Sequence, residues 1–182
     1  MGKSKRSVVG ILLGLGIALC ICIGVAFFLT FFIDSEPFSG VESPLKTGEA
    51  APDFSLPSLN EQEIHLEDLR GKPILLNFWA SWCDTCVAEM PLLESTAQKY
   101  ENLLVIGVNV GDTPAKVKNF VSAEHLSFTI LLDEDGKISE DYTITGYPTS
   151  IFIDKAGIIQ FVILGELNAV ELAENLALIG IE

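Results

Sequence analysis

The sequence predicts an α/β domain, with a mixed central sheet flanked by helices, that follows one N-terminal transmembrane helix. From residue 52 onward, apolar runs of strand length alternate with segments in which apolar residues recur at helical spacing. Such alternation is typical of an α/β sandwich, and about 130 residues can bury a core of their own. Residues 8–33 form a separate apolar stretch without a charged side chain.

The apolar stretch of residues 8–33 is long enough to cross a membrane. As a helix it would span about 39 Å, whereas the hydrocarbon core of a bilayer is ~30 Å thick. A cleaved signal peptide would have a shorter apolar region and a small-residue cleavage site, and no such site follows this run. A retained single-pass anchor is therefore the favoured interpretation. Cys20 and Cys22 lie inside the anchor, and we assign them no function.

The charges on either side of the anchor predict its orientation. The basic tail, residues 1–7, precedes the anchor, and Asp34 and Glu36 follow it. The positive-inside rule places the tail in the cytoplasm and the rest of the chain on the extracytoplasmic side of the cell membrane, in a periplasm or on the outer face. Residues 34–51 are rich in Pro, Gly and Ser and predict a linker, and residues 52–182 form the domain.

The part of the chain after the anchor is strongly acidic. It carries 8 basic and 25 acidic residues, a net charge of −17. A surface of this sign favours solubility and argues against nucleic acid or anionic lipid as the partner.

The elements of the domain follow from local patterns. Continuous apolar runs predict buried parallel-type strands, and a turn at residues 155–157 predicts a hairpin between the last two strands. Pro114 suits the first turn of a helix, and Asn168 suits an N-cap. The predicted strands are residues 53–56, 63–66, 74–79, 103–110, 128–132, 149–154 and 158–164. The predicted helical segments are residues 67–71, 85–100, 114–123, 136–142 and 168–178.

The most informative stretch, W-A-S-W-C-D-T-C at residues 79–86, joins a predicted strand to a predicted helix. Its two cysteines, Cys83 and Cys86, fall on the first turn of that helix, where unpaired N–H groups and the helix dipole stabilise a thiolate. Residues at i and i+3 share one face of the turn and are close enough to form a disulfide. A C-x-x-C pair in this context is typical of thioredoxin-like redox proteins.

Other roles for the cysteine pair fit less well. A structural zinc site needs four ligands, but the other two cysteines lie in the anchor, and His65 and His125 show no ligand spacing. Covalent haem attachment requires His directly after the second cysteine, where this chain has Val87. We therefore expect neither a metal nor a cofactor. A structural disulfide or metal ligation is the alternative to a redox-active pair.

Several motifs together resemble the TlpA/ResA group of the thioredoxin superfamily. They are A-P-D-F at 51–54, N-F-W-A-S-W-C-x-x-C at 77–86, E-M-P at 89–91, V-N-V at 108–110 and G-Y-P-T at 146–149. That group comprises membrane-anchored thiol–disulfide oxidoreductases of the extracytoplasmic face, including factors for cytochrome c maturation. The resemblance covers roughly residues 50–180 and implies a thioredoxin-like fold.

The resemblance implies a role for each cysteine. Cys83, the more accessible of the two, would attack a disulfide sulfur, and Cys86 would resolve the mixed disulfide. Asp84 lies between them, and its carboxylate opposes thiolate formation at Cys83, which favours a reducing couple. Thr85 occupies a position at which many members of the group carry Pro.

Glu89 is the candidate proton acceptor. In thioredoxins a buried acid six residues before the first cysteine accepts the proton of the second, but this chain has Asn77 there. Glu89 lies three residues after Cys86 on the same helix face, and the ResA-like group has an acid at the matching position. We expect it to be partly buried, with a raised pKa. The alternative is a solvated helix residue.

The resemblance also predicts the substrate-binding residues. It implies that Pro148 has a cis peptide bond and faces the dithiol, and that the peptide at Tyr147 pairs with substrate backbone. Trp82 adjoins Cys83 and is expected to shield the site and contact the partner, whereas Trp79 ends a buried strand and is expected in the core.

These residues predict an enzyme that reduces disulfides of apoproteins such as apocytochrome c, with a membrane thiol reductase as its electron donor. One alternative is a dithiol oxidant of the DsbA type. Another is a peroxiredoxin-like peroxidase, because A-P-D-F also opens that family, although Ala80 stands where that family has Thr. A tethered binding module without enzymatic activity is the last alternative, and the intact C-x-x-C pair argues against it.

Overall fold

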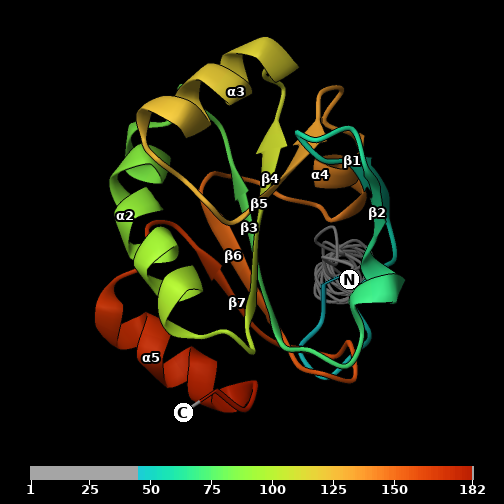
Figure 1. Cartoon of the computed structure of the whole chain (residues 1–182). Coiled ribbons are helices and arrows are strands. Elements are labelled where there is room, and N and C mark those ends of the chain that lie inside the picture. The colour runs from blue at the N-terminus through green and yellow to red at the C-terminus, as the bar shows by residue number, and fades with distance from the viewer. Residues whose placement is uncertain (1–44, 182) are drawn as a thin grey trace, which may run out of the picture. The chain divides into compact units, whose positions relative to one another are not determined.

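The computed structural model describes residues 45–181, which contain a five-stranded mixed sheet (Figure 1). In spatial order the strands are β5 (Thr129–Asp133), β4 (Leu104–Val110), β3 (Ile74–Trp79), β6 (Thr149–Ile153) and β7 (Ile159–Leu164). Strands β3, β4 and β5 are parallel, and β6 and β7 continue the sheet in antiparallel pairing. The predicted mixed central sheet is therefore confirmed.

Helices cover both faces of this sheet (Figure 1). One face packs against α2 (Asp84–Lys99), α3 (Pro114–Ala123) and α5 (Ala169–Leu178), with side chains from all three helices in a single buried cluster. The other face packs against a 3₁₀ turn, η1 (Leu66–Leu69), the short helix α4 (Lys137–Asp141) and a small antiparallel sheet of β1 (Ser55–Pro57) and β2 (Glu63–His65). The cysteine pair belongs to the first of these two clusters.

Strand β3 lies at the centre of the sheet and delivers the chain to the cysteine motif. All six of its residues are buried, as expected for an apolar strand with a neighbour on each side. The Trp79 indole packs against the adjacent strand at Gly107, where a Cβ atom would lie only 2.9 Å from the indole nitrogen. A side chain at position 107 would therefore displace Trp79, the last residue of β3.

Most predicted elements are present, with ends shifted by one or two residues. Strand β3 and helix α3 have the predicted bounds. Asn168 caps α5 as predicted, because its Oδ1 accepts from the backbone N–H groups of Val170 and Glu171 at 3.0 Å. The first strand begins later than expected, at Ser55. Asp53, the first residue of the predicted strand, lies outside β1 and accepts a 2.8 Å hydrogen bond from the Glu67 N–H at the start of η1.

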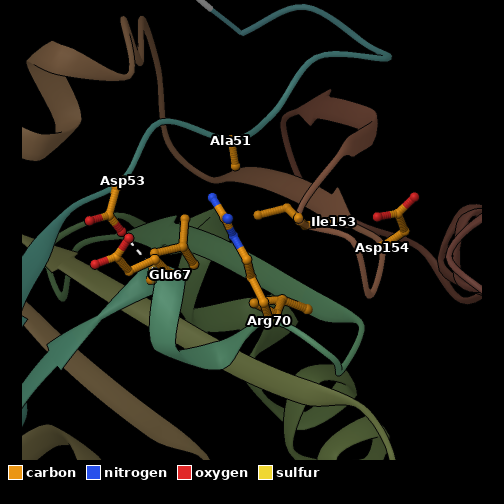
Figure 2. Close-up of a pocket in the computed structure, with 9 residues that line it drawn as sticks. Ala51, Asp53, Glu67, Arg70, Ile153 and Asp154 are labelled. Carbon is orange, nitrogen blue, oxygen red and sulfur yellow. Dashed lines mark hydrogen bonds between the residues drawn. The ribbon is translucent and has the colours of Figure 1, made fainter.

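The contact between Asp53 and Glu67 borders a small pocket (Figure 2). Its volume is about 10 Å³, roughly the space that one water molecule requires. The guanidinium of Arg70 extends into it toward Ala51. None of the residues lining this pocket belongs to the cysteine motif or to the G-Y-P-T segment, so the A-P-D-F motif serves the fold here.

The predicted transmembrane anchor, residues 8–33, lies outside the described residues. Within residues 45–181, no helix combines the length and apolar character needed to cross a bilayer. The last residues of the predicted linker are hydrogen-bonded to the β6–β7 hairpin: Gly48 N–H donates to Ile159 O at 2.7 Å and Ala51 N–H to Gly157 O at 2.9 Å.

Candidate active site

Cys83 and Cys86 form a disulfide at the N-terminus of α2, with their Cα atoms 5.2 Å apart. Cys83 is the N-cap residue, and Cys86 lies in the first turn. The exposed fraction is 8% for Cys83 and 0% for Cys86. Cys83 is thus the more accessible of the two cysteines, as predicted, and an incoming thiolate can reach it more readily than Cys86.

The sulfur of Cys83 has two hydrogen-bond partners at the helix terminus. The Cys86 N–H donates to Cys83 Sγ at 3.2 Å, and the Thr85 hydroxyl lies 3.4 Å from the same sulfur. A helix N-cap usually supplies a side-chain oxygen for such an N–H group, and here the sulfur takes that place. Both donors and the helix dipole would stabilise a thiolate at Cys83 in the reduced enzyme. The sequence analysis did not predict the contact of the Thr85 hydroxyl with Cys83. The position of Thr85 two residues after the N-cap, where a side chain can approach the N-cap side chain, could have indicated it.

Glu89 lies in the core one turn beyond Cys86, with an exposed fraction of 2%. Its Oε1 accepts from Asn77 Nδ2 at 2.7 Å, and its Oε2 accepts from the Leu167 N–H at 2.9 Å. Burial raises the pKa of Glu89 to about 6, although both hydrogen bonds lower it, and the charge of Glu166 raises it further. The alternative of a solvated helix residue is therefore wrong, and the carboxyl can exchange a proton near neutral pH.

Asn77 joins this buried carboxyl to the sheet. It lies on β3, opposite Ser150 of β6, and its Nδ2 donates to Ser150 Oγ at 2.9 Å as well as to Glu89. Both Asn77 and Ser150 have an exposed fraction of 0%. The Asn77 amide cannot act as a proton acceptor, but it holds the Glu89 carboxyl in place. Sequence reasoning missed this role.

Asp112 fixes the turn that leads from β3 to Cys83. Its Oδ2 accepts from the Ser81 N–H at 2.8 Å and from Asn109 Nδ2 at 3.1 Å, and its Oδ1 pairs with Lys116 Nζ at 2.7 Å. Burial raises the pKa of Asp112, but the hydrogen bonds from Lys116, Ser81 and Asn109 outweigh this effect and lower it to about 2. The G-D-T-P loop at residues 111–114 therefore anchors the active-site turn.

The Tyr147–Pro148 peptide bond is cis, as the resemblance implied. Tyr147 meets Trp82 edge to face, with ring centroids 5.9 Å apart and an interplanar angle of 83°. Trp82 is 62% exposed, whereas Trp79 is fully buried and packs on Phe120. The structure therefore brings Trp82 and Tyr147 together beside the disulfide, and the prediction that Trp79 belongs to the core is confirmed.

The two histidines stay apart from the disulfide. His65 ends β2, and His125 lies in the turn between α3 and β5 with φ at 54°. Across residues 45–181, the acidic, histidine and cysteine side chains form no group of three or more that could hold a metal ion.

Comparison with known families agrees with this geometry. The model of the AhpC/TSA family matches residues 47–162. The thioredoxin-like protein YneN of Bacillus subtilis is 37% identical over 147 residues, which cover 79% of this chain and 86% of YneN. The thiol-disulfide oxidoreductase ResA of Bacillus cereus is 35% identical over 150 residues, covering 81% of this chain and 83% of ResA.

Solved structures resemble the fold as well. A protein described as the thiol:disulfide interchange protein DsbE of Chlorobium tepidum superposes with a TM-score of 0.70 at 31% identity, covering 75% of this chain and 99% of that one. StoA of Bacillus subtilis superposes with a TM-score of 0.60 at 28% identity, covering 70% of this chain and 98% of StoA. The chain thus belongs to the AhpC/TSA family and is a thiol–disulfide oxidoreductase of the ResA type with a thioredoxin-like fold.

Proposed function

We propose that Cys83 and Cys86 are the redox centre of an extracytoplasmic reductase, anchored to the cell membrane by residues 8–33. The observation that carries the proposal is the pairing of this disulfide, at a helix N-terminus, with a buried carboxyl one turn further along the same helix. A purely structural disulfide would have no use for a buried acid whose pKa is raised to about 6.

The reaction has two exchange steps. In the reduced enzyme, the Cys83 thiolate attacks one sulfur of the substrate disulfide, forms a mixed disulfide and releases the other substrate sulfur as a thiolate. Cys86, as a thiolate, then attacks Cys83 Sγ. The Cys83–Cys86 disulfide forms, and the second substrate sulfur leaves and takes up a proton. Two electrons pass from the enzyme dithiol to the substrate, and the enzyme ends oxidised.

Glu89 is the proton acceptor for Cys86 in this scheme. Cys86 is fully buried, so its proton has no direct route to bulk water. Glu89 follows it by three residues and therefore shares its helix face. With a pKa of about 6, the carboxyl is largely ionised at neutral pH and ready to accept the proton.

Substrate would bind beside Pro148. The Tyr147 backbone would form hydrogen bonds with the substrate backbone, and Trp82 would cover the substrate disulfide. The client class follows from the resemblance to the TlpA/ResA group: oxidised apoproteins on the outer side of the membrane, with apocytochrome c the favoured example. A membrane thiol reductase would return electrons to the enzyme, because no glutathione pool is expected there.

Single-cysteine variants test the mechanism. The domain from residue 45 onward, supplied with dithiothreitol, should reduce insulin disulfides. Cys83→Ser should abolish turnover, and Cys86→Ser should accumulate a mixed disulfide between Cys83 and the substrate. Full activity in both variants would contradict the dithiol mechanism.

The reduction potential decides the direction of electron flow. A reductase should lie nearer the ~−270 mV of thioredoxin than the ~−120 mV of DsbA. Equilibration of the Cys83–Cys86 couple against redox buffers measures this value. A result above about −150 mV would assign the protein to the dithiol oxidants instead.

A further inference from the structure

A buried hydroxyl contacts the side chain of Tyr147 from a separate element of the fold. Ser139, on the short helix α4, has an exposed fraction of 4%, and its Oγ lies 2.9 Å from the Tyr147 hydroxyl. Tyr147 immediately precedes the cis-bonded Pro148. The hydrogen bond therefore ties the loop beside the disulfide to α4, an element of the opposite face of the sheet.

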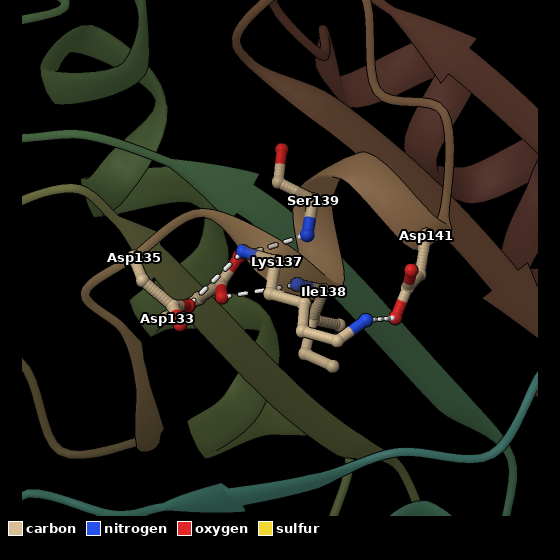
Figure 3. Close-up of polar contacts among 6 residues, drawn as sticks. All are labelled: Asp133, Asp135, Lys137, Ile138, Ser139 and Asp141. Carbon is tan, nitrogen blue, oxygen red and sulfur yellow. Dashed lines mark hydrogen bonds and ion pairs between the residues drawn. The ribbon is translucent and has the colours of Figure 1, made fainter.

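Helix α4 is held in place by the carboxylate of Asp133 (Figure 3). Asp133, at the end of β5, is 1% exposed, and it accepts from the Ile138 N–H at 3.1 Å and from the Ser139 N–H at 2.8 Å. A five-residue helix is not stable by itself, because nucleation is unfavourable and few bonds follow it. The backbone of Ser139 is thus fixed to the central sheet, which makes its hydroxyl a rigid support.

The Tyr147 side chain connects Ser139 to the active site, because its hydroxyl binds Ser139 and its ring contacts Trp82. It meets the Trp82 ring edge to face, directly beside Cys83 in the chain, and Trp82 is otherwise largely exposed, at 62%. A tyrosine ring held only at its Cβ can rotate about two torsions. With the hydroxyl bound to Ser139, both ends of the Tyr147 side chain are fixed, and the Trp82 ring packs against a ring of fixed orientation.

We propose that Ser139 is a positioning residue for substrate recognition: by holding the Tyr147 hydroxyl, it orients the Tyr147–Trp82 pair toward a polypeptide disulfide. The inference rests on the proposed function, because it assumes that substrate binds beside Pro148. It concerns the polypeptide around the scissile disulfide and leaves the electron chemistry of the cysteines unaltered.

A double-mutant cycle tests the coupling. The measured quantity is the rate constant for reducing insulin divided by that for hydroxyethyl disulfide, which has no polypeptide. Ser139→Ala and Tyr147→Phe should each lower this ratio about fivefold, which corresponds to the ~1 kcal/mol net free energy of one hydrogen bond. The double variant should be no worse than either single variant. The reduction potential should not change in Ser139→Ala.

A matched control is Ser95→Ala, because Ser95 is an exposed helical serine whose Oγ donates only to the Leu92 carbonyl. It should leave the ratio unchanged. A wild-type ratio in Ser139→Ala, or a double variant whose loss equals the product of the two single losses, would overturn the positioning role.

Side-chain mobility gives a readout that does not depend on activity. The chain contains two tryptophans, so two indole N–H signals are expected in a ¹⁵N spectrum. In the oxidised protein, the heteronuclear NOE of the Trp82 indole should fall in Ser139→Ala and in Tyr147→Phe, while that of buried Trp79 stays constant. An unchanged Trp82 signal would contradict the positioning role. If the wild-type protein does not reduce insulin, that result would instead contradict the proposed function.

Discussion

Asn77 Nδ2 lies 2.7 Å from Glu89 Oε1, so the residue six positions before Cys83 holds the carboxyl three positions after Cys86. In thioredoxins the acid itself occupies the strand position. Here the acid is on helix α2, and the strand contributes an amide that fixes it. A buried carboxyl near the second cysteine is thus supplied from a different element, and the amide donor partly offsets the effect of burial on its pKa.

Glu89→Gln should slow disulfide exchange, because the buried acceptor for the Cys86 proton is lost. Loss of a general acid or base typically lowers a rate 10²–10⁴-fold, and less if water can replace the group. The inflection of the pH–rate profile near pH 6 should disappear, and the titration of the Cys86 thiol should shift. Glu174→Gln, a change at an exposed position on α5, is the control and should alter neither measurement.

Glu89→Gln should also change how the free energy of unfolding depends on pH. Because the pKa of Glu89 is raised from 4.5 to about 6, its contribution to stability is fully present below pH 4.5 and is lost as the pH rises through 6. A shift of this size corresponds to about 2 kcal/mol. The free energy of unfolding of Glu89→Gln, relative to wild type, should therefore rise by about 2 kcal/mol between pH 4 and pH 7. Parallel stability curves in chemical denaturation would contradict this.

Asn77→Ala should raise the pKa of Glu89 further, because a hydrogen bond that lowers it is removed. The inflection in the pH–rate profile should move above pH 6, and the variant should be destabilised by about 1–3 kcal/mol, since a buried carboxyl loses a partner. Ser150→Ala removes the other contact of Asn77 and leaves the bond to Glu89 in place. If both variants shift the inflection equally, the direct bond is not the cause.

Thr85→Val should raise the pKa of the Cys83 thiol, because the hydroxyl 3.4 Å from its sulfur can no longer donate to the thiolate. The lost stabilisation of the thiolate is limited to the net free energy of one hydrogen bond, at most about 1.5 kcal/mol. A less stable thiolate makes the couple more reducing, by up to about 30 mV. Thr113→Val is a suitable control, because Thr113 is the N-cap of α3 and its side chain makes no capping bond. A lower thiol pKa in Thr85→Val would contradict the assigned contact.

Asp112→Ala should loosen the turn before Cys83, because the Ser81 N–H and Asn109 Nδ2 lose their acceptor. We expect a lower unfolding free energy, by about 1–3 kcal/mol, and slower exchange. The wild-type pKa of about 2 means that Asp112 stabilises the fold above pH 3.8, and that this contribution is lost as the pH falls toward 2. The difference in unfolding free energy between wild type and Asp112→Ala should therefore become smaller as the pH falls from 3.8 toward 2. If this difference in unfolding free energy does not depend on pH, the ionised Asp112 carboxylate is not the source of the stabilisation.

The proposed topology is tested by reporter fusions. Alkaline phosphatase joined after Ser39 should be active, because the chain there is expected outside the membrane, and a reporter that works only in the cytoplasm should be inactive at the same point. The reverse pattern would place the cysteine pair in the cytoplasm and would remove the need for a membrane electron donor.

The fold class and the cysteine motif could be predicted from the sequence because they depend on local patterns. An uninterrupted apolar run predicted β3, and a C-x-x-C pair after it placed the disulfide on the first turn of α2. The N-cap at Asn168 was equally local. Glu89 could be proposed because helical spacing puts it on the face of Cys86.

Only the tertiary structure decided how these residues are supported. The contacts of Glu89 with Asn77 and Leu167 join residues 12 and 78 positions apart. The contact between Ser139 and Tyr147 depends on a five-residue helix that Asp133 holds in place. Burial and hydrogen bonding across elements set the pKa of Glu89 and the orientation of the Tyr147 and Trp82 rings. Periodicity in a sequence reports which face of an element is apolar, but not which side chain of another element meets it.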